Sequence, residues 1–543
     1  MNCRNIILAS AAIFTLTSCA GWLSEDGPMT NRVEDFFTSE ETAVQVVNAA
    51  YTPLMWEFQS TYYSEFFIGD IMSDDALKGG QNIADMADAY DLENFKAISN
   101  NSLVLDYYRA NFQGIARANL ALEQLPKMED LDQALASRLT GEASFLRALY
   151  YFRLVRLFGG VPISESPIYS AEGWKIPRST VDEVYGLIVS DLENAAGKLP
   201  LKSQYAPEDL GRATKGAAEA MLLKVYLYWG DCKRNGGDTA GAAEKYSSAK
   251  TWGGKFIANE AAEYTLCSAY RDNFTLDGEN GPESVFEVQY MAEGTSDYGE
   301  GNGFSRGTLA TILLRSRSSH FSNSGWGFCH PTQNLYDEYE AGDPRRDASI
   351  FTPTDEEITT QAEELYLGNR YLTLKRTIME GRDYPAIDHA TRSPINRIEI
   401  RLADVYLLYA EACLRNDDAS EAKTYLEKVR DRAREGASIL PAFPGYKVPD
   451  YRDGYALRQL QDNAADLELA IRHERRVELA MESHRWYDLC RWGIAKEVMD
   501  AYAQTETDLA KANMGTFVKG KHELLPIPDE EVRIGSLEQN FGW

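Results

Sequence analysis

Residues 471–493, IRHERRVELAMESHRWYDLCRWG, concentrate side chains that could carry out acid–base or metal chemistry. The segment holds two His, three Glu, five Arg and a Cys. Imidazole, thiolate and carboxylate groups are the usual ligands of zinc, and histidine and carboxylic acids are the usual general acids and bases. The first question is therefore whether this segment is an active site or a metal site.

The spacing of the two histidines argues against a shared metal ion. His473 and His484 are eleven residues apart, and a continuous helix over about 465–492 would place them on nearly the same face. The rise of about 1.5 Å per residue would still separate them by about 16 Å, whereas zinc contacts its ligands at about 2 Å. The H-E-x-x-H zinc motif also fails, because Val477 stands where its second histidine should be.

The same helical face carries apolar residues, which indicates that it packs into the core. His473 and Glu474 then point inward, where a charge needs a partner. We therefore interpret the segment as a buried, ion-paired structural helix rather than a catalytic site. The candidate partners are Arg472, Arg475, Arg476 and Arg485, and the packing residues are Ala470, Val477, Ala480, Met481, Trp486, Leu489, Cys490 and Trp492.

The N-terminus predicts export and a lipid anchor. A short apolar run over 6–14 is typical of a signal peptide and too short to span a bilayer. It leads into Leu-Thr-Ser-Cys, the lipobox pattern of bacterial lipoproteins. We expect a signal peptide over 1–18, lipidation at Cys19 and a tether over 19–37, which would hold the chain on the membrane. An ordinary signal peptide with a chance cysteine is the alternative.

Charge and cysteine usage narrow the function classes. The net charge of −28 argues against a nucleic-acid partner, because phosphate binding needs clustered Lys and Arg. The cysteines left after export have wide spacing and no CxxC, which excludes zinc-ribbon and redox motifs. We expect most of these cysteines to be small, buried hydrophobic residues. Export from the cytoplasm would allow one disulfide, but the sequence does not indicate which two cysteines would form it. These cysteines are Cys232, Cys267, Cys329, Cys413 and Cys490.

Helical periodicity dominates the rest of the chain, so we expect a mostly α fold. Several predicted helices form adjacent pairs that resemble tetratricopeptide repeats, about four in all, with small residues that let helices approach closely. Gly and Pro residues end several of them. The predicted helices are 39–58, 102–125, 132–158, 180–198, 213–230, 240–253, 398–415, 419–434 and 465–492.

Three long stretches interrupt the helices, over 60–100, 255–397 and 434–464. They are rich in Gly, Asn, Asp, Ser and aromatic residues, and 282–291 alternates like a strand. Loops of this length are usually functional or disordered, and their aromatic content argues against disorder. We therefore expect a loop-rich face with a few short strands that carries the function.

Five blocks of sequence resemble, in chain order, the SusD/RagB family of outer-membrane nutrient-binding lipoproteins of Bacteroidetes. The residues Ser24-Glu25-Asp26 after the lipobox are similar to the surface-export signal of lipoproteins from the same bacteria. Together with the lipobox, the resemblance spans nearly the whole chain. The blocks are GEASFLRALYYFRLVRLFGGVPI (141–163), RATKGAAEAMLLKVYLYWGD (212–231), RLADVYLLYAEACLR (401–415), ERRVELAMESHRWYDLCRWG (474–493) and LLPIPDEEVRIGSLEQNFGW (524–543).

The resemblance implies one SusD-like domain over 38–543. Its helical scaffold would lie mainly in 38–59, 102–253 and 398–500, and its ligand-face loops in 60–101 and 255–397. The implied function is capture of an oligosaccharide, or of a peptide in the RagB branch. The ligand would be delivered to a SusC-like, TonB-dependent β-barrel transporter in the outer membrane. The family does no covalent chemistry, so we expect no enzyme activity and no cofactor.

Sugars bind by stacking on aromatic rings, with polar groups at the rim for their hydroxyls. Trp326, flanked by two glycines that can present it outward, is the first candidate, and an indole packed inward is the alternative. The polar segment 69–80 is a second candidate, with a solvated turn as its alternative. The remaining candidates are Phe328, Tyr290 and Tyr298 from the aromatic loops, Asp70, Asp74 and Lys78 from the polar segment, and Asn101 and Tyr108, which lie near where the family places part of its pocket.

Motifs for catalysis do not occur. A nucleophile elbow and a phosphate-binding loop are both absent, and Cys329-His330 are only neighbours in sequence. A glycosidase needs two carboxylates about 5 to 10 Å apart, which 83 acidic residues could meet by chance. A surface glycosidase and peptide or glycopeptide capture remain the alternatives. The Asp-rich turn over 70–75 would offer oxygen ligands to a structural calcium ion, although the EF-hand pattern is absent.

Overall fold

The computed structural model describes residues 37–56, 65–170, 172–292, 307–315, 317, 325–355, 365–377, 393–434 and 440–543, apart from the side chain of residue 260. The predicted signal peptide, Cys19 and Tyr298 lie outside these residues. None of the described helices is both long and apolar enough to cross a membrane.

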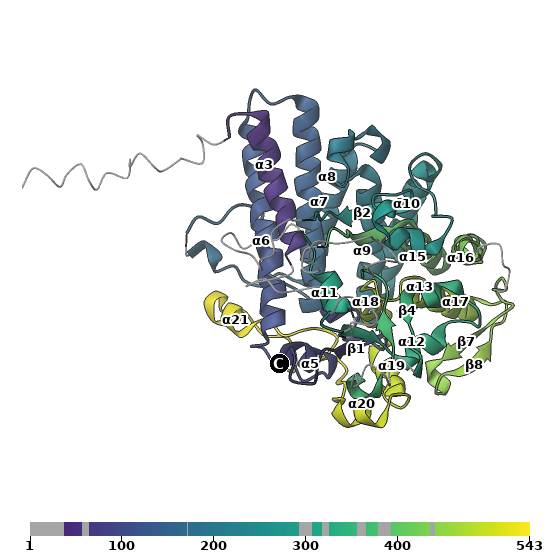
Figure 1. The fold of residues 1–543 in the computed structure, drawn as a ribbon. Coiled ribbons are helices and arrows are strands. Elements are labelled where there is room, and N and C mark those ends of the chain that lie inside the picture. The colour runs from purple at the N-terminus through teal and green to yellow at the C-terminus, as the bar shows by residue number, and fades with distance from the viewer. Residues whose placement is uncertain are drawn as a thin grey trace, which may run out of the picture.

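Long helices that follow one another along the chain pack side by side (Figure 1). Helix α6 packs on α7, α7 on α8, α8 on α9, α9 on α10 and α15 on α16. The predicted mostly α fold is therefore confirmed. The long helices are α3 (Glu40–Tyr51), α6 (Ser102–Gln124), α7 (Gln133–Phe158), α8 (Val181–Lys198), α9 (Lys215–Asn235), α10 (Thr239–Glu263), α15 (Leu402–Arg415), α16 (Ala419–Ala433) and α17 (Ala464–Glu478).

The ends of these helices follow from local chemistry. The Thr180 hydroxyl and the Glu183 carboxylate form a capping box at the start of α8. Helix α7 ends at Gly159, whose φ of +69° favours a residue without a Cβ. Most of α7 is buried, because it contacts α6, α8 and α3. It therefore forms the centre of the helical layer.

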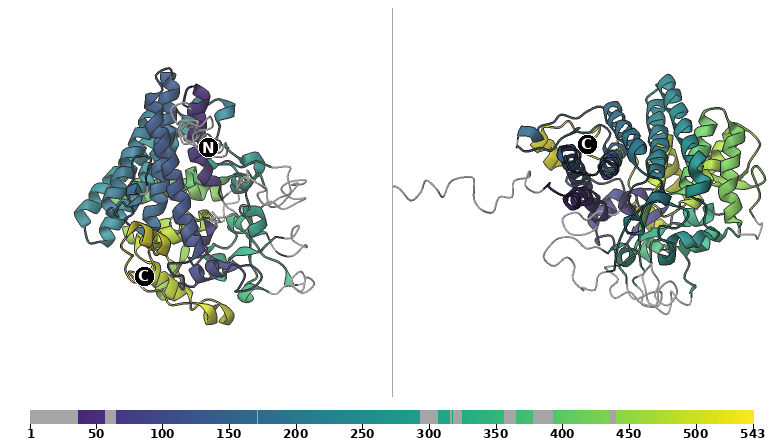
Figure 2. Two further views of the ribbon diagram at one scale, coloured as in Figure 1. Left: turned by 90° about the vertical axis from the view of Figure 1, so that its left-hand side faces the viewer. Right: turned by 90° about the horizontal axis from the view of Figure 1, so that it is seen from above.

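Strands are short and occur in antiparallel pairs: β1 with β3, β2 with β6, β4 with β5 and β7 with β8. Figure 2 shows the green segments that carry β3, β4 and β5 on the side of the molecule away from the blue helices α6 to α8, whereas β2 lies among the long helices (Figure 1). The strands are β1 (Ala76–Gly79), β2 (Ser284–Val288), β3 (Phe328–Pro331), β4 (Ile350–Phe351), β5 (Leu372–Thr373), β6 (Arg397–Arg401), β7 (Lys447–Asp450) and β8 (Ala456–Gln459). The shorter α-helices are α4 (Phe66–Gly69), α5 (Ala87–Glu93), α11 (Ala310–Leu314), α12 (Gln333–Glu338), α13 (Pro344–Ser349), α18 (Arg485–Trp492), α19 (Ala495–Tyr502), α20 (Asp508–Asn513) and α21 (Asp529–Gly535).

Two predicted helices were wrong in part. The predicted helix 398–415 begins with strand β6, because Arg-Ile-Glu-Ile-Arg alternates and pairs with β2. The predicted helix 465–492 is two helices, α17 and α18. The break contains Met481 and Ser483 at φ +61° and +66°, values that an α-helix cannot accommodate. The predicted strand over 282–291 is confirmed as β2.

Among the described residues all five cysteines are free. Cys267, Cys329 and Cys413 are buried, as expected of small hydrophobes, whereas Cys232 is exposed and Cys490 is half-buried. The large core runs through both the helical layer and the strand-bearing side, and a smaller cluster joins α3 to α6 and α7. The two sides therefore support each other through shared side chains.

Candidate functional site

Two segments singled out in the sequence meet in one small sheet. Strand β1, from the polar segment 69–80, pairs antiparallel with β3, which directly follows Trp326 and Gly327. Leu77 lies opposite His330, and Gly79 lies opposite Phe328. The sheet thus brings together residues about 250 positions apart in the chain.

Glycine makes this close pairing feasible. Gly79 and Gly80 both have φ of +76°, and Gly327 has φ of +69°. A Cβ added at Gly79 would lie 2.3 Å from the carbonyl oxygen of Gly327. The Gly80 N–H donates to the same carbonyl oxygen. A larger residue at Gly79 or at Gly80 would push β1 away from β3. It would also move the indole of Trp326, which precedes β3.

Trp326 is half-buried: it packs against the large core and keeps part of its indole exposed. Its N–H donates to the carbonyl of Ile312 at 2.7 Å, and its carbonyl accepts from Arg317 Nη1 at 3.2 Å. These backbone contacts hold the ring at the edge of the small sheet. Trp326 therefore remains a candidate for stacking on a ligand.

An exposed loop lies next to Trp326. Residues 81–84 are exposed, with Ile83 at 45%. The Gln81 N–H donates to the Asp85 carboxylate at 2.8 Å, and Arg317 lies 3.7 Å from the same carboxylate. We call residues 81–85, Arg317 and Trp326 the Trp326 face. It combines an aromatic ring, an apolar side chain and exposed polar groups.

Lys78 is buried beneath the 81–85 loop of this face and does not contact solvent, contrary to the sequence expectation. Its side chain is buried, and its ammonium donates to the carbonyls of Asn82, at 2.9 Å, and Asp85. The ammonium also lies 5.5 Å from the ring centre of Phe328 and 5.0 Å from that of Tyr366. Burial lowers the pKa of Lys78 to about 8. The role of Lys78 is to fix the 81–85 loop.

Asp70 and Asp74 are also internal, which corrects their expected place at the ligand surface. Asp74 is fully buried and forms ion pairs with Arg476 at 2.9 Å and Arg485 at 2.8 Å. Asp70 accepts hydrogen bonds from the N–H and hydroxyl of Ser483. Burial raises the pKa of Asp70 to about 7. A buried carboxylate needs such partners, and here they come from α17 and the turn after it.

The other predicted contacts lie in the core. Phe328, Tyr290, Asn101 and Tyr108 are at most 8% exposed. Asn101 caps α6, accepting from the Val104 N–H at 3.2 Å. The rings of Phe328, Tyr290 and Tyr108 belong to the large core. Residue type alone does not tell an aromatic ring at the surface from one in the core, so the sequence could not exclude them. The sequence analysis missed Ile83 and Arg317, for which no spacing or motif gives a signal.

The charged segment 471–493 is a buried ion-pair network, as predicted, although it is not one helix. The predicted partners of Glu474 were wrong, because Arg345 and Arg430 pair with it from other parts of the chain. His473 Nδ1 donates to the Glu338 carboxylate at 2.7 Å, and no group of three or more His, Cys, Asp or Glu in the described part of the chain is suited to a metal ion. Each of the segment's glutamates is neutralised by a basic side chain. The pairs are Glu474 with Arg345 and Arg430, Glu478 with Arg345, Arg401 and Arg432, and Glu482 with Arg401 and Lys375.

Comparison with known proteins places this arrangement among known folds. Surface glycan-binding protein A from Bacteroides fluxus superposes with a TM-score of 0.75 at 26% identity, covering 93% of this chain and 100% of that one. A laminarin-binding SusD-like protein superposes with a TM-score of 0.73 at 27% identity, with the same coverage. The SusD-like protein P2 of Formosa agariphila is 27% identical over 549 residues, 97% of each chain.

Two family models match different parts of the chain. One, described as the SusD family, matches residues 282–543. The other, described as starch-binding associating with outer membrane, matches residues 22–227. Both models, the SusD-like relatives and the shared helical fold agree with the resemblance in the sequence blocks, and on this evidence the chain belongs to the SusD family.

Proposed function

We propose that this protein captures a glycan at the cell surface and delivers it, without covalent chemistry or a cofactor, to a SusC-like TonB-dependent transporter. Lipidation at Cys19 would hold it on the outer membrane. Three facts about the chain support the proposal: its family, its lipobox, and its likeness to a laminarin-binding SusD-like protein at 27% identity.

The Trp326 face is the proposed glycan contact, and the half-buried tryptophan at the edge of the small sheet is the observation that carries this assignment. The apolar C–H face of a sugar ring can stack on the indole, with Ile83 extending the apolar surface. Exposed polar groups of Gln81, Asn82 and Arg317 are available to sugar hydroxyls. Because the ring is held by backbone hydrogen bonds on both sides, little order has to be gained on binding.

Asp85 has a structural role at this face. Its carboxylate accepts a hydrogen bond from the Gln81 N–H at 2.8 Å and lies 3.7 Å from Arg317, so it shapes the loop.

Calorimetry with laminarin, starch and a set of peptides tests the proposal. Trp326→Leu keeps an apolar side chain against the core but removes the stacking ring. We expect at least a tenfold loss in affinity, about 1.4 kcal/mol. Trp174→Leu, which removes a tryptophan that is 54% exposed on the 3-10 turn Glu172–Trp174, is the matched control and should bind as the unchanged protein does.

Three results would contradict the proposal. Equal glycan affinity in Trp326→Leu would remove this residue from the site. Binding of peptides alone would favour peptide capture on the same scaffold. Release of reducing ends from a bound polysaccharide by the purified protein would show a glycosidase.

A further inference from the structure

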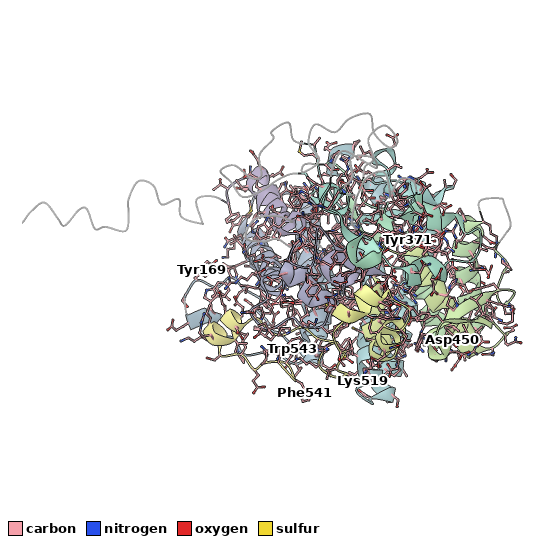
Figure 3. All side chains as sticks on the ribbon, turned by 60° about the horizontal axis from the view of Figure 1, so that its bottom comes forward. Tyr169, Tyr371, Asp450, Lys519, Phe541 and Trp543 are labelled. Carbon is pink, nitrogen blue, oxygen red and sulfur yellow. The ribbon has the colours of Figure 1, made fainter. Side chains whose placement is uncertain are left out.

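A cavity lies within the helical layer and shares no residue with the Trp326 face. Its volume is about 500 Å³, within the range of small-molecule sites in proteins. Helices α7, α8, α9 and α18 and the C-terminal segment around residues 519–524 line it. Figure 3 shows Lys519, at the rim, on the side of the molecule that also carries Phe541 and Trp543.

The walls of this cavity are mainly apolar and aromatic. Tyr185, Tyr228 and Tyr487 line it together with the aliphatic side chains of Val155 and Val181. The three tyrosines are at most 4% exposed, so their rings are held by the surrounding helices. Rigid aromatic walls suit a flat, apolar ligand body, which gains contact area without ordering the protein.

One cation in the lining has no anionic partner. Arg156 stacks on the rings of Tyr487, at 3.8 Å, and Phe152, at 4.6 Å. In the part of the chain that the structure describes, no carboxylate lies within ion-pair distance of Arg156, and its buried Nε has no hydrogen-bond partner. Glu65, whose charge acts on Arg156, is already paired with Arg153 at 3.2 Å.

This lack of a partner contrasts with the neighbouring arginines. Arg153, one helical turn earlier on α7, pairs with Glu65 and Glu399. Arg491, in the same cavity lining, pairs with Glu411 at 2.7 Å and Asp231 at 2.8 Å. Arg156 is half-buried, with its Nε buried and its side chain lining the cavity. A guanidinium in that position without a paired carboxylate can form a charge-assisted hydrogen bond with a bound anion.

A second polar group in the lining is also unpartnered. Tyr228 is 4% exposed, and its hydroxyl has no hydrogen-bond partner among the described residues. Arg156 additionally borders a smaller cavity of about 40 Å³, which holds little more than water. The larger cavity is therefore the one with room for a ligand that reaches Arg156.

We propose that this cavity binds a small organic anion, a molecule whose apolar or aromatic body lies between the tyrosines and whose single negative group pairs with Arg156. The aromatic walls recognise the body, and the unpaired guanidinium selects the charge. This site is independent of glycan capture at the Trp326 face.

A pair of fluorescent probes of the same shape tests the charge requirement. The probes are 8-anilinonaphthalene-1-sulfonate, which is anionic, and N-phenyl-1-naphthylamine, which is neutral. We expect one anionic probe per chain, bound at least tenfold more tightly than the neutral one. Arg156→Gln should remove that preference. Arg117→Gln is the matched control, because Arg117 also lies over an aromatic ring, Trp56 at 4.9 Å, but outside the cavity.

A thiol provides the second measurement. Cys232 is exposed and lines the cavity, whereas Cys490 is half-buried. Burial raises the pKa of both thiols, and that of Cys490 well above its usual range, so iodoacetamide should react first at the more accessible Cys232. The anionic probe should slow alkylation of Cys232 in the unchanged protein at least fivefold. This measurement decides the question even if Arg156→Gln fails to fold.

The proposal is overturned if the two probes bind equally well, if Arg156→Gln keeps the preference for the anion, or if the anionic probe leaves the alkylation rate of Cys232 unchanged.

Discussion

At the scale of single residues, partners decide what a charged side chain does. Arg476 is 4% exposed and contacts Asp74, Asp75 and Glu338, all at 2.8 to 2.9 Å. Two of these acids directly precede strand β1. The segment that most resembles an active site therefore acts as the anchor of the sheet edge that presents Trp326.

Arg476→Met should destabilise the protein by about 3 to 5 kcal/mol, because it leaves buried carboxylates without their cation. Urea unfolding followed by circular dichroism measures this. Arg452→Met is the control: Arg452 pairs with Asp450 at 2.7 Å but its side chain is 53% exposed, so we expect a change of at most about 1 kcal/mol. Similar losses in both variants would contradict the anchoring role.

His473 makes stability depend on pH. Burial alone would lower its pKa, but the hydrogen bond to Glu338 and the nearby charge of Glu340, 3.7 Å away, raise it from 6.5 to about 9. Arg476 and Arg430 hold the same two carboxylates in place. Since the folded pKa is the higher one, the protonated imidazole stabilises the fold fully below pH 6.5. This stabilisation is lost as pH rises through 9.

His473→Gln should therefore lower the free energy of unfolding by about 3 kcal/mol at pH 6, with the difference narrowing towards pH 9.5. Urea titrations at both pH values measure it. Burial lowers the pKa of His522 to about 4, so His522 is neutral across this range and His522→Gln should give a constant difference. A constant difference for His473→Gln would show that its charge does not matter.

At the scale of elements, the approach of β1 to β3 depends on backbone conformations that only glycine adopts easily. Gly79 is the tightest point, because its φ is positive and the carbonyl of Gly327 leaves no room for a Cβ. The break between α17 and α18 also depends on positive φ values, here at two residues that are not glycine, Met481 and Ser483. Such positions cannot be told from ordinary residues by hydrophobic periodicity.

Gly79→Ala should destabilise the protein by about 2 to 3 kcal/mol and weaken glycan binding, because the strain displaces β1 from the residues next to Trp326. Gly186→Ala is the matched control. Gly186 lies within α8, and a Cβ there would meet nothing within 4 Å, so we expect a gain of about 0.5 to 1 kcal/mol. Thermal unfolding and calorimetry measure both. Unchanged stability and affinity in Gly79→Ala would contradict the tight pairing.

At the scale of the whole molecule, helices α6 to α8 lie on one side and strands β3 to β5 on the other, and the large core continues through both (Figure 2). A protein held near a membrane by an N-terminal lipid can present either side outward. The predicted lipid anchor at Cys19 would place the whole molecule at the membrane. Because lipidation requires the cell's own enzymes, this prediction is tested in cells.

Cys19→Ala should abolish incorporation of an alkyne-tagged fatty acid and move the protein out of the detergent phase after phase separation. Cys3→Ala is the control, because Cys3 lies within the predicted signal peptide and should have no effect. Continued fatty-acid labelling of the Cys19→Ala protein would contradict the predicted lipidation site.

The sequence by itself determined most of the helices, the family and the structural nature of the charged segment. Apolar periodicity reports which residues face the core of a helix, and ordered blocks of sequence report ancestry. Tertiary structure alone decided which of the candidate residues are buried and which are exposed. In the sequence, Asp74 and Lys78 resemble surface groups in a turn. In the structure, Asp74 is covered by α17, which is remote in sequence, and Lys78 by the 81–85 loop, which has no sequence pattern. Burial depends on what packs against a residue, and that is set by contacts between distant parts of the chain.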